Sequence, residues 1–145
     1  MGLLITLIVI FTEIFASITD LQLSSKNTSN VADDGRYIYS RFIYDVNRAE
    51  SISTPINEGE TTNTLSLIIN GDSYNYTLAN GVLSITDPTG SYALNGYGSQ
   101  VVGLSFTKIG TGANSTVRIN FTVNGIVTKQ GLSDQQSFQT TAGLR

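Results

Sequence analysis

The sequence predicts an α+β fold in which a long N-terminal α-helix packs on an antiparallel β-sheet meander. Up to Ile52, apolar residues recur at helical spacing. After Glu60 the apolar residues alternate with polar ones, which is the spacing of a half-buried strand. Asn-Gly pairs separate these alternating runs, as in β-hairpins. The length of 145 residues fits one domain built from these two parts.

The first segment, residues 1–30, is expected to be an apolar helix that enters a membrane or the core of a filament. Residues 3–18 form an apolar run of 16 residues that only Thr6, Glu13 and small residues relieve, whereas a helix that crosses a bilayer needs about 20. The segment therefore has the character of the later part of a membrane helix. The side chains expected to face lipid or neighbouring helices are Leu3, Leu4, Leu7, Ile8, Ile10, Phe11, Ile14, Phe15 and Ile18.

Two other interpretations of this segment stay open. A cleaved signal peptide would begin with positive charge, but no Lys or Arg precedes Lys26, and only Ala16 and Ser17 offer a weak cleavage site. A buried helix of a soluble protein is the second alternative. Residues 3–11 are apolar on all faces, which is unusual outside membranes and oligomer cores.

The second segment, residues 31–145, is expected to be a globular headpiece that begins with helix up to about residue 52. Residues 24–30 are polar and favour helix weakly, so the helix is expected to weaken or break there. Gly35 interrupts the second half, and Arg41 and Asp45 are expected to pair on its wet face. The helix residues expected to pack on the sheet are Ala32, Tyr39, Phe42, Val46 and Ala49.

The strands are predicted from alternation and turns. Residues 64–87 are expected to form a three-stranded meander with turns at Asn70-Gly71 and Asn80-Gly81. In a later strand, Val102, Leu104 and Phe106 are expected to point to one face. The chain is expected to turn again at Asn124-Gly125 and to end with an edge strand over residues 137–145. The sheet residues expected to pack on the helix are Leu104, Phe106, Val117, Ile119 and Phe121.

The composition excludes several kinds of chemistry. The chain has no cysteine and no histidine, which excludes zinc sites of the usual kind, thiol catalysis and Ser-His-Asp hydrolysis. A net charge of −3 and scattered cations give no reason to expect a nucleic acid as partner. A calcium site in residues 57–60 is a minor alternative. A sugar platform of tyrosines is another, formed by Tyr37, Tyr39, Tyr44, Tyr74 and Tyr76, although Tyr74 and Tyr76 are expected to pack across strands instead. We expect no enzyme, no catalytic residue, no metal and no cofactor.

The order of these features resembles the type IV pilin-like superfamily, especially the J-like minor pseudopilins of type II secretion and the related W-type minor pilins. The likeness spans most of the chain through loose motifs taken in order. These motifs are residues 2–15 as apolar helix, Asp34-Gly35-Arg36-Tyr37 with Arg41, Asp45-Val46-Asn47-Arg48-Ala49-Glu50, Val102-Gly103-Leu104-Ser105-Phe106, and the terminal Phe138-Gln139-Thr140-Thr141-Ala142-Gly143-Leu144-Arg145.

The N-terminus departs from the family pattern. Members begin with a basic leader and a processed glycine, followed by Phe-Thr-Leu and a glutamate at the fifth mature position. Here Leu3 follows Gly2, Leu7 stands where the glutamate would be, and Glu13 lies too deep. The resemblance therefore predicts an N-terminally truncated sequence, with about a dozen residues missing upstream. A longer helix would bring Glu13 near the membrane surface and restore the roughly 20 apolar residues of a span; a role of Glu13 in subunit registry is the alternative.

The resemblance implies a structural subunit of a type IV pilus or a type II secretion pseudopilus. It implies a prepilin held in the bacterial inner membrane by its helix, with the headpiece in the periplasm or outside the cell. Its partners would be inner-membrane lipid before assembly, and afterwards the helices of other pilin or pseudopilin subunits in the filament. The alternative from another class is a secreted or membrane-anchored β-rich binding module, such as an adhesin or a carbohydrate-binding domain.

Overall fold

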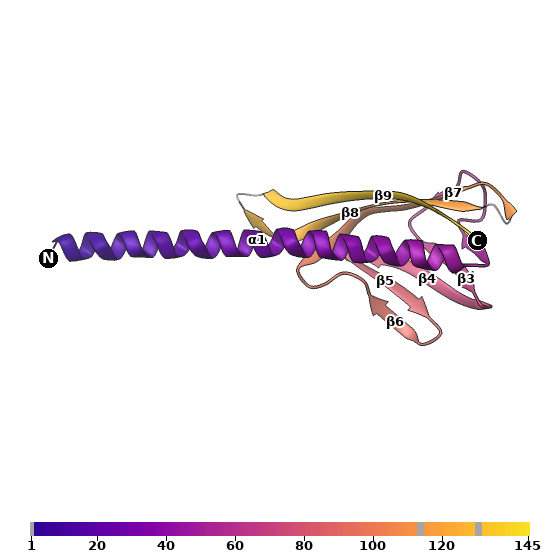
Figure 1. Cartoon of the computed structure of the whole chain (residues 1–145), viewed down its shortest axis with the longest axis horizontal. Helices are drawn as coiled ribbons and strands as arrows, with labels where there is room; N and C mark the ends of the chain where they lie inside the picture. Colours follow the sequence, from indigo (N-terminus) through magenta and orange to yellow (C-terminus); the bar gives the residue numbers. More distant parts are fainter. Residues whose placement is uncertain (1, 113–114, 130–131) are drawn as a thin grey trace.

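One long helix and two antiparallel sheets make up the fold, which places it in the α+β class (Figure 1). The computed structural model describes residues 2–112, 115–129 and 132–145, and the side chains of residues 2–7, 129 and 132 lie outside this description. The helix α1 (Gly2–Arg48) extends far beyond the sheets on its N-terminal side, and both sheets lie along its C-terminal half (Figure 1).

The first sheet contains the predicted meander. Its strands follow the order β1 (Ser51–Thr54), β3 (Leu65–Ile69), β4 (Asp72–Ala79), β5 (Val82–Asp87) and β6 (Gly90–Ala93). Asn70 and Asn80 have φ angles of 53° and 52°, and Gly71 and Gly81 have 82° and 78°. Positive φ at both central residues defines the type I′ turn, so the two Asn-Gly pairs close the hairpins as predicted.

The second sheet follows the order β2 (Thr61–Thr62), β7 (Ser99–Ile109), β8 (Thr116–Lys129) and β9 (Leu132–Gly143). An edge strand at the C-terminus was predicted, and β9 begins earlier than expected. The predicted facing of Val102 is wrong, because the β7–β8 register shifts between Val102 and Ser105, where Gly103 has φ 62°. This bulge places Val101, and not Val102, in the core.

The third predicted hairpin, at Asn124-Gly125, is also wrong. Strand β8 continues through Gly125, which pairs with Ser99 of β7 and does not adopt positive φ. A Cβ atom at Gly125 would lie 2.3 Å from the side-chain amide of Asn27 on α1. Glycine is therefore required here for the close approach of the helix to the strand, and not for a turn. The actual connection between β8 and β9 includes residues 130–131, which are outside the described residues.

The helix differs from the prediction at two places. The polar stretch of residues 24–30 causes no break, and α1 runs continuously for 47 residues. The helix ends at Arg48, earlier than the predicted residue 52. Ile52 instead pairs with Leu67 across β1 and β3 and is buried. The strand partner and the core contact decide the boundary, which helical spacing alone could not reveal.

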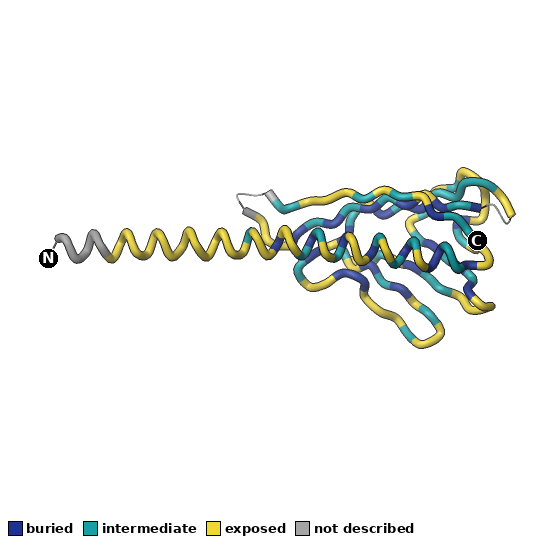
Figure 2. Tube along the Cα trace, viewed as in Figure 1, coloured by how far each residue is buried: buried dark blue, intermediate teal, exposed yellow. Residues whose placement is uncertain are grey.

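The core lies where the C-terminal half of α1 meets both sheets (Figure 2). The ring of Phe42 lies 4.8 Å from that of Tyr76, 5.3 Å from that of Phe106 and 5.8 Å from that of Phe121, measured between centroids. Val31 and Ile38 are also buried, although the predicted stripe contained their neighbours Ala32 and Tyr39, which are only half-buried. The other residues expected at the contact are buried, namely Val46, Ala49, Leu104, Val117 and Ile119.

Candidate functional site: the exposed half of the helix

The N-terminal half of α1 leaves apolar side chains uncovered. We call residues 8–23 the exposed segment, because every one of them is exposed (Figure 2). Phe15 is 76% exposed and Leu21 is 61% exposed. The predicted residues Leu3, Leu4 and Leu7 precede the segment and lie outside the described side chains. The nine large apolar side chains of the segment are Ile8, Val9, Ile10, Phe11, Ile14, Phe15, Ile18, Leu21 and Leu23.

By length and composition, α1 could cross a membrane near its N-terminal end, and a signal sequence would meet the same criterion. Its threonines suit an apolar environment. The hydroxyl of Thr12 donates to the carbonyl oxygen of Ile8 at 2.8 Å, and that of Thr19 donates to the carbonyl oxygen of Phe15 at 2.9 Å. Because these hydroxyls are satisfied within the helix, moving them out of water leaves no unpaired donor.

The exposed segment has a polar and an apolar side. Glu13, Asp20 and Asn27 recur every seven residues, which is close to two helical turns, so they lie along one side. Asn27 is buried against the headpiece and marks that side. Ile18 precedes Asn27 by nine residues, about two and a half turns, and therefore lies on the opposite side. The polar stripe thus continues the headpiece side of α1, whereas the apolar stripe around Ile18 faces away from the headpiece.

Glu13 is the main cost of placing this segment in lipid. A carboxylate at the centre of a membrane helix costs about 2.5–3.5 kcal/mol on insertion scales. Five large apolar side chains lie between Glu13 and the headpiece, and each is about half exposed or more. Burying them contributes on the order of 5–10 kcal/mol in total. Burial of the apolar side chains therefore outweighs the cost of Glu13. These five are Ile14, Phe15, Ile18, Leu21 and Leu23.

Hydrogen bonds from the helix to the headpiece begin at Asn27. The Nδ2 of Asn27 donates to the carbonyl oxygen of Val127 and to the Oδ2 of Asp134, both at 3.2 Å. Two turns further along the helix, Asp34 accepts hydrogen bonds from the hydroxyl of Ser99 at 2.5 Å and from the backbone N–H of Gly96 at 2.9 Å. These bonds attach α1 to β8, β9 and the start of β7. Sequence reasoning missed Asn27, although its seven-residue spacing from Asp20 was visible.

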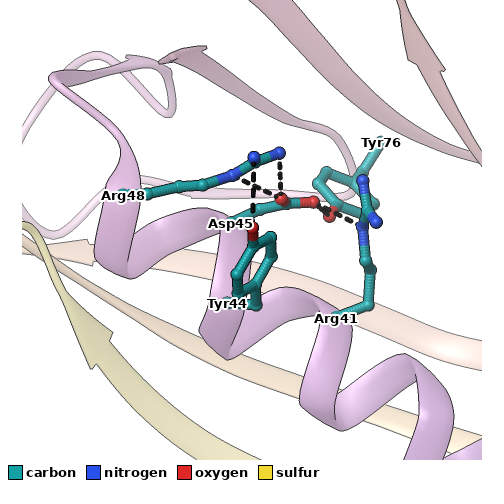
Figure 3. A network of polar contacts seen from close by, with 5 residues as sticks. All are labelled: Arg41, Tyr44, Asp45, Arg48 and Tyr76. Carbon is teal, nitrogen blue, oxygen red and sulfur yellow. Dashed lines mark hydrogen bonds and ion pairs between the residues drawn. The ribbon is translucent and has the colours of Figure 1, made fainter. Parts of the chain in front are cut away.

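A buried carboxylate fixes the other end of the helix (Figure 3). Asp45 is fully buried, which corrects the prediction that it pairs with Arg41 on the wet face. Its Oδ2 lies 2.8 Å from Arg41 Nε, and its Oδ1 lies 2.8 Å from a terminal guanidinium nitrogen of Arg48. The hydroxyl of Tyr76 on β4 also donates to Oδ2. We call Arg41, Asp45, Arg48 and Tyr76 the Asp45 cluster.

The Asp45 cluster is a structural connection between helix and sheet. Burial, together with the neighbouring negative charge of Asp45, raises the pKa of the Tyr76 phenol well above its ordinary value of 10.0. Tyr76 is therefore a neutral hydrogen-bond donor at physiological pH. Because it is buried at the helix contact, it cannot be part of an exposed sugar platform. The guanidinium of Arg48 also lies 4.6 Å from the ring centre of Tyr44 and 5.3 Å from that of Tyr74.

A hollow of about 500 Å³ lies at the end of the headpiece nearest the exposed segment. Val82, Tyr97 and Ile126 expose apolar surface in it, and Tyr97 is fully exposed. The polar side chains that line it are largely used inside the fold. Asn95 accepts from the N–H of Leu83 and donates to two carbonyl oxygens, and the hydroxyl of Ser99 binds Asp34. The hollow therefore suits an apolar contact better than a sugar.

Within the described residues, no group of three or more acidic side chains is placed to hold a metal ion. At the minor calcium candidate, residues 57–60, one carboxylate closes a turn. Glu60 Oε2 accepts from the backbone N–H groups of Ile56 at 3.0 Å and Asn57 at 2.8 Å. The residues of highest functional interest are thus those of the exposed segment.

Comparison of the chain with models of protein families, with curated proteins and with solved structures finds no match.

Proposed function

We propose that this protein is a structural subunit of a type IV pilin-like filament, as a minor pilin or a pseudopilin. The observation that carries the proposal is the exposed segment, whose apolar stripe lies on the side of α1 opposite the headpiece. A subunit with this arrangement can place its helix in a central bundle while its headpiece stays outside. The motifs that resemble the pilin-like superfamily support the same function.

The proposed mechanism is a transfer of the helix between two apolar environments. In the inner membrane, lipid covers the exposed segment and holds the subunit. During assembly, the apolar stripe around Ile14 and Ile18 leaves lipid and packs against the helices of other pilin or pseudopilin subunits. The polar stripe of Glu13 and Asp20 faces outward, beneath the subunit's own headpiece. The process makes and breaks no covalent bond, so the chain needs no catalytic group.

Cysteine cross-linking in the cells that make the protein tests this proposal. The chain has no cysteine, so each variant carries a single thiol. Ile14→Cys places the thiol on the apolar stripe, and Asp20→Cys is the matched control on the polar stripe. A benzophenone maleimide attached to each thiol inserts into nearby C–H bonds on illumination. We expect the label at Ile14→Cys to join the apolar helices of neighbouring filament subunits, identified by mass spectrometry of the joined peptides. Equal cross-linking from both positions, or none under conditions of filament assembly, would contradict the proposal.

A further inference from the structure

The end of the headpiece around the emerging helix exposes a cluster of apolar side chains. We call Leu23, Val82, Tyr97, Ile126 and Val127 the basal surface. All five are exposed by 41% or more, and Tyr97 is fully exposed. The connection from β6 to β7, which contains Tyr97, lies at the end of the headpiece nearest the N-terminus (Figure 1). The basal surface therefore faces in the same direction as the exposed segment.

Backbone and side-chain contacts hold the basal surface together. The N–H of Ile126 donates to the carbonyl oxygen of Gly98 at 3.2 Å, which joins the Tyr97 loop to β8. Asn27 binds the carbonyl oxygen of Val127, which joins β8 to the helix. A second hollow brings Leu23 and Lys26 of the helix together with Tyr97 and Val127. The apolar side chains are thus fixed around α1 at the level where the exposed segment ends.

We infer that the basal surface rests on the surface of the lipid bilayer before the subunit is assembled. The inference relies on the membrane anchoring in the proposed function. An anchor that held the headpiece well above the bilayer would leave Ile14, Ile18 and Leu21 in water. Drawing these side chains into lipid brings Leu23, and with it the basal surface, to the membrane boundary. The exposed segment, residues 8–23, extends about 24 Å at 1.5 Å per residue, so it fits within the roughly 30 Å of a hydrocarbon core.

The chemistry of the basal surface fits this boundary. Tyrosine is enriched at membrane–water interfaces because its ring is apolar and its hydroxyl is polar. Lys26 can lay its aliphatic chain along lipid and keep its ammonium group in water. Asp20 lies only one turn from Leu23 and can reach the headgroup layer. This placement puts Glu13 inside the membrane, contrary to the expectation from a longer helix that it lies at the surface.

Electrostatics has only a small part in this contact. Among the described side chains at this level, Lys26 is accompanied by Asp20 and Asp134, so the surface has no positive excess. We therefore expect the contact to form on vesicles of uncharged phosphatidylcholine, without anionic lipid. A basic patch would instead require anionic lipid and would weaken with added salt.

Single tryptophans test the inference, because the chain has none of its own. The full chain is reconstituted in phosphatidylcholine vesicles that contain lipids brominated at defined depths, and tryptophan quenching is measured. Tyr97→Trp reports the basal surface, and Phe15→Trp reports the exposed segment. Tyr37→Trp is the control, since Tyr37 is exposed on α1 about 20 Å beyond Leu23. Each variant replaces one exposed aromatic side chain by another, so folding is preserved.

We expect lipids brominated near the headgroup to quench Tyr97→Trp several-fold more than Tyr37→Trp, while lipids brominated deeper quench Phe15→Trp. Quenching of Phe15→Trp without quenching of Tyr97→Trp would overturn the inference and leave the membrane anchor intact. An absence of quenching at Phe15→Trp would overturn the anchor itself, and the inference with it. The two failures are therefore distinguishable.

Discussion

The two halves of α1 have the same backbone structure and opposite surroundings. Between Asn27 and Val46 the helix buries one side against both sheets, whereas residues 8–23 are exposed on every side. Asp20 and Asp45 illustrate the difference, because the first is exposed and the second is fully buried among two arginines and a tyrosine. The headpiece thus covers one side of its own helix half, and the described residues leave the other half of the helix uncovered.

The largest expected effect comes from removing the two aspartates in turn. Asp45→Ala leaves Arg41, Arg48 and the Tyr76 hydroxyl without their shared acceptor, and should lower the free energy of unfolding by about 3–5 kcal/mol. Asp20→Ala, the control in the exposed half, should change it by less than about 0.5 kcal/mol. Urea unfolding in detergent measures both values. Similar values for the two variants would show that the Asp45 cluster does not stabilise the headpiece.

A second test changes only the sheet side of the Asp45 cluster. Tyr76→Phe removes one hydrogen bond to a charged group and should lower the free energy of unfolding by about 1.5–3 kcal/mol at neutral pH. The matched control is Tyr92→Phe, which removes a hydroxyl from the exposed strand β6 and should leave the free energy of unfolding almost unchanged. A loss as small as that of Tyr92→Phe would mean that the bond from Tyr76 to Asp45 contributes little.

The raised pKa of Tyr76 adds a pH dependence of known sign. The unfolded chain releases the phenol proton at about pH 10, whereas the folded chain retains it to higher pH. The contribution of this proton to stability is therefore complete below about pH 10 and is lost as the pH rises through the raised pKa. Between about pH 9 and 11, the wild type should lose more stability than Tyr76→Phe in urea unfolding. Parallel losses would contradict the raised pKa.

The smallest expected effect concerns Gly35. Alanine favours helix by roughly 1 kcal/mol over glycine, but a Cβ at this position would lie 2.1 Å from the Phe138 ring. Phe138 would have to leave its stacked position 5.0 Å from Phe121. Gly35→Ala should therefore lower stability by about 1–2 kcal/mol in urea unfolding. In a Phe138→Ala background the same change should instead raise it; destabilisation in both backgrounds would exclude the ring as the cause.

The features that were predictable from the sequence depend on local chemistry. Asn70-Gly71 and Asn80-Gly81 determine their turns through their own φ angles, so the meander followed from a few adjacent residues. The apolar character of residues 8–18 is equally local. The exposure of the segment was therefore expected once the sheet had been assigned to the other half of the helix.

The features that were not predictable depend on contacts between distant residues. Asp45 is buried because Tyr76, from another element, reaches it, and its spacing from Arg41 does not reveal this. Gly125 was predicted as a turn residue from the adjacent Asn124. Glycine is required there for a different reason, because Asn27 on the helix lies too close for a Cβ atom. The basal surface combines a loop, a strand and a helix, so no single stretch of sequence identifies it.

The unbroken helix also has a mechanical consequence. Hydrogen bonds attach the headpiece to α1 at Asn27 and again at Asp45, which are 18 residues or about 27 Å apart. The two attachments involve different strands. Two separated points of attachment resist rotation of the helix within the headpiece better than one. A pull or a twist applied to the N-terminal end of α1 would therefore be transmitted along the helix to the headpiece. The helix and the headpiece would move together as one rigid body.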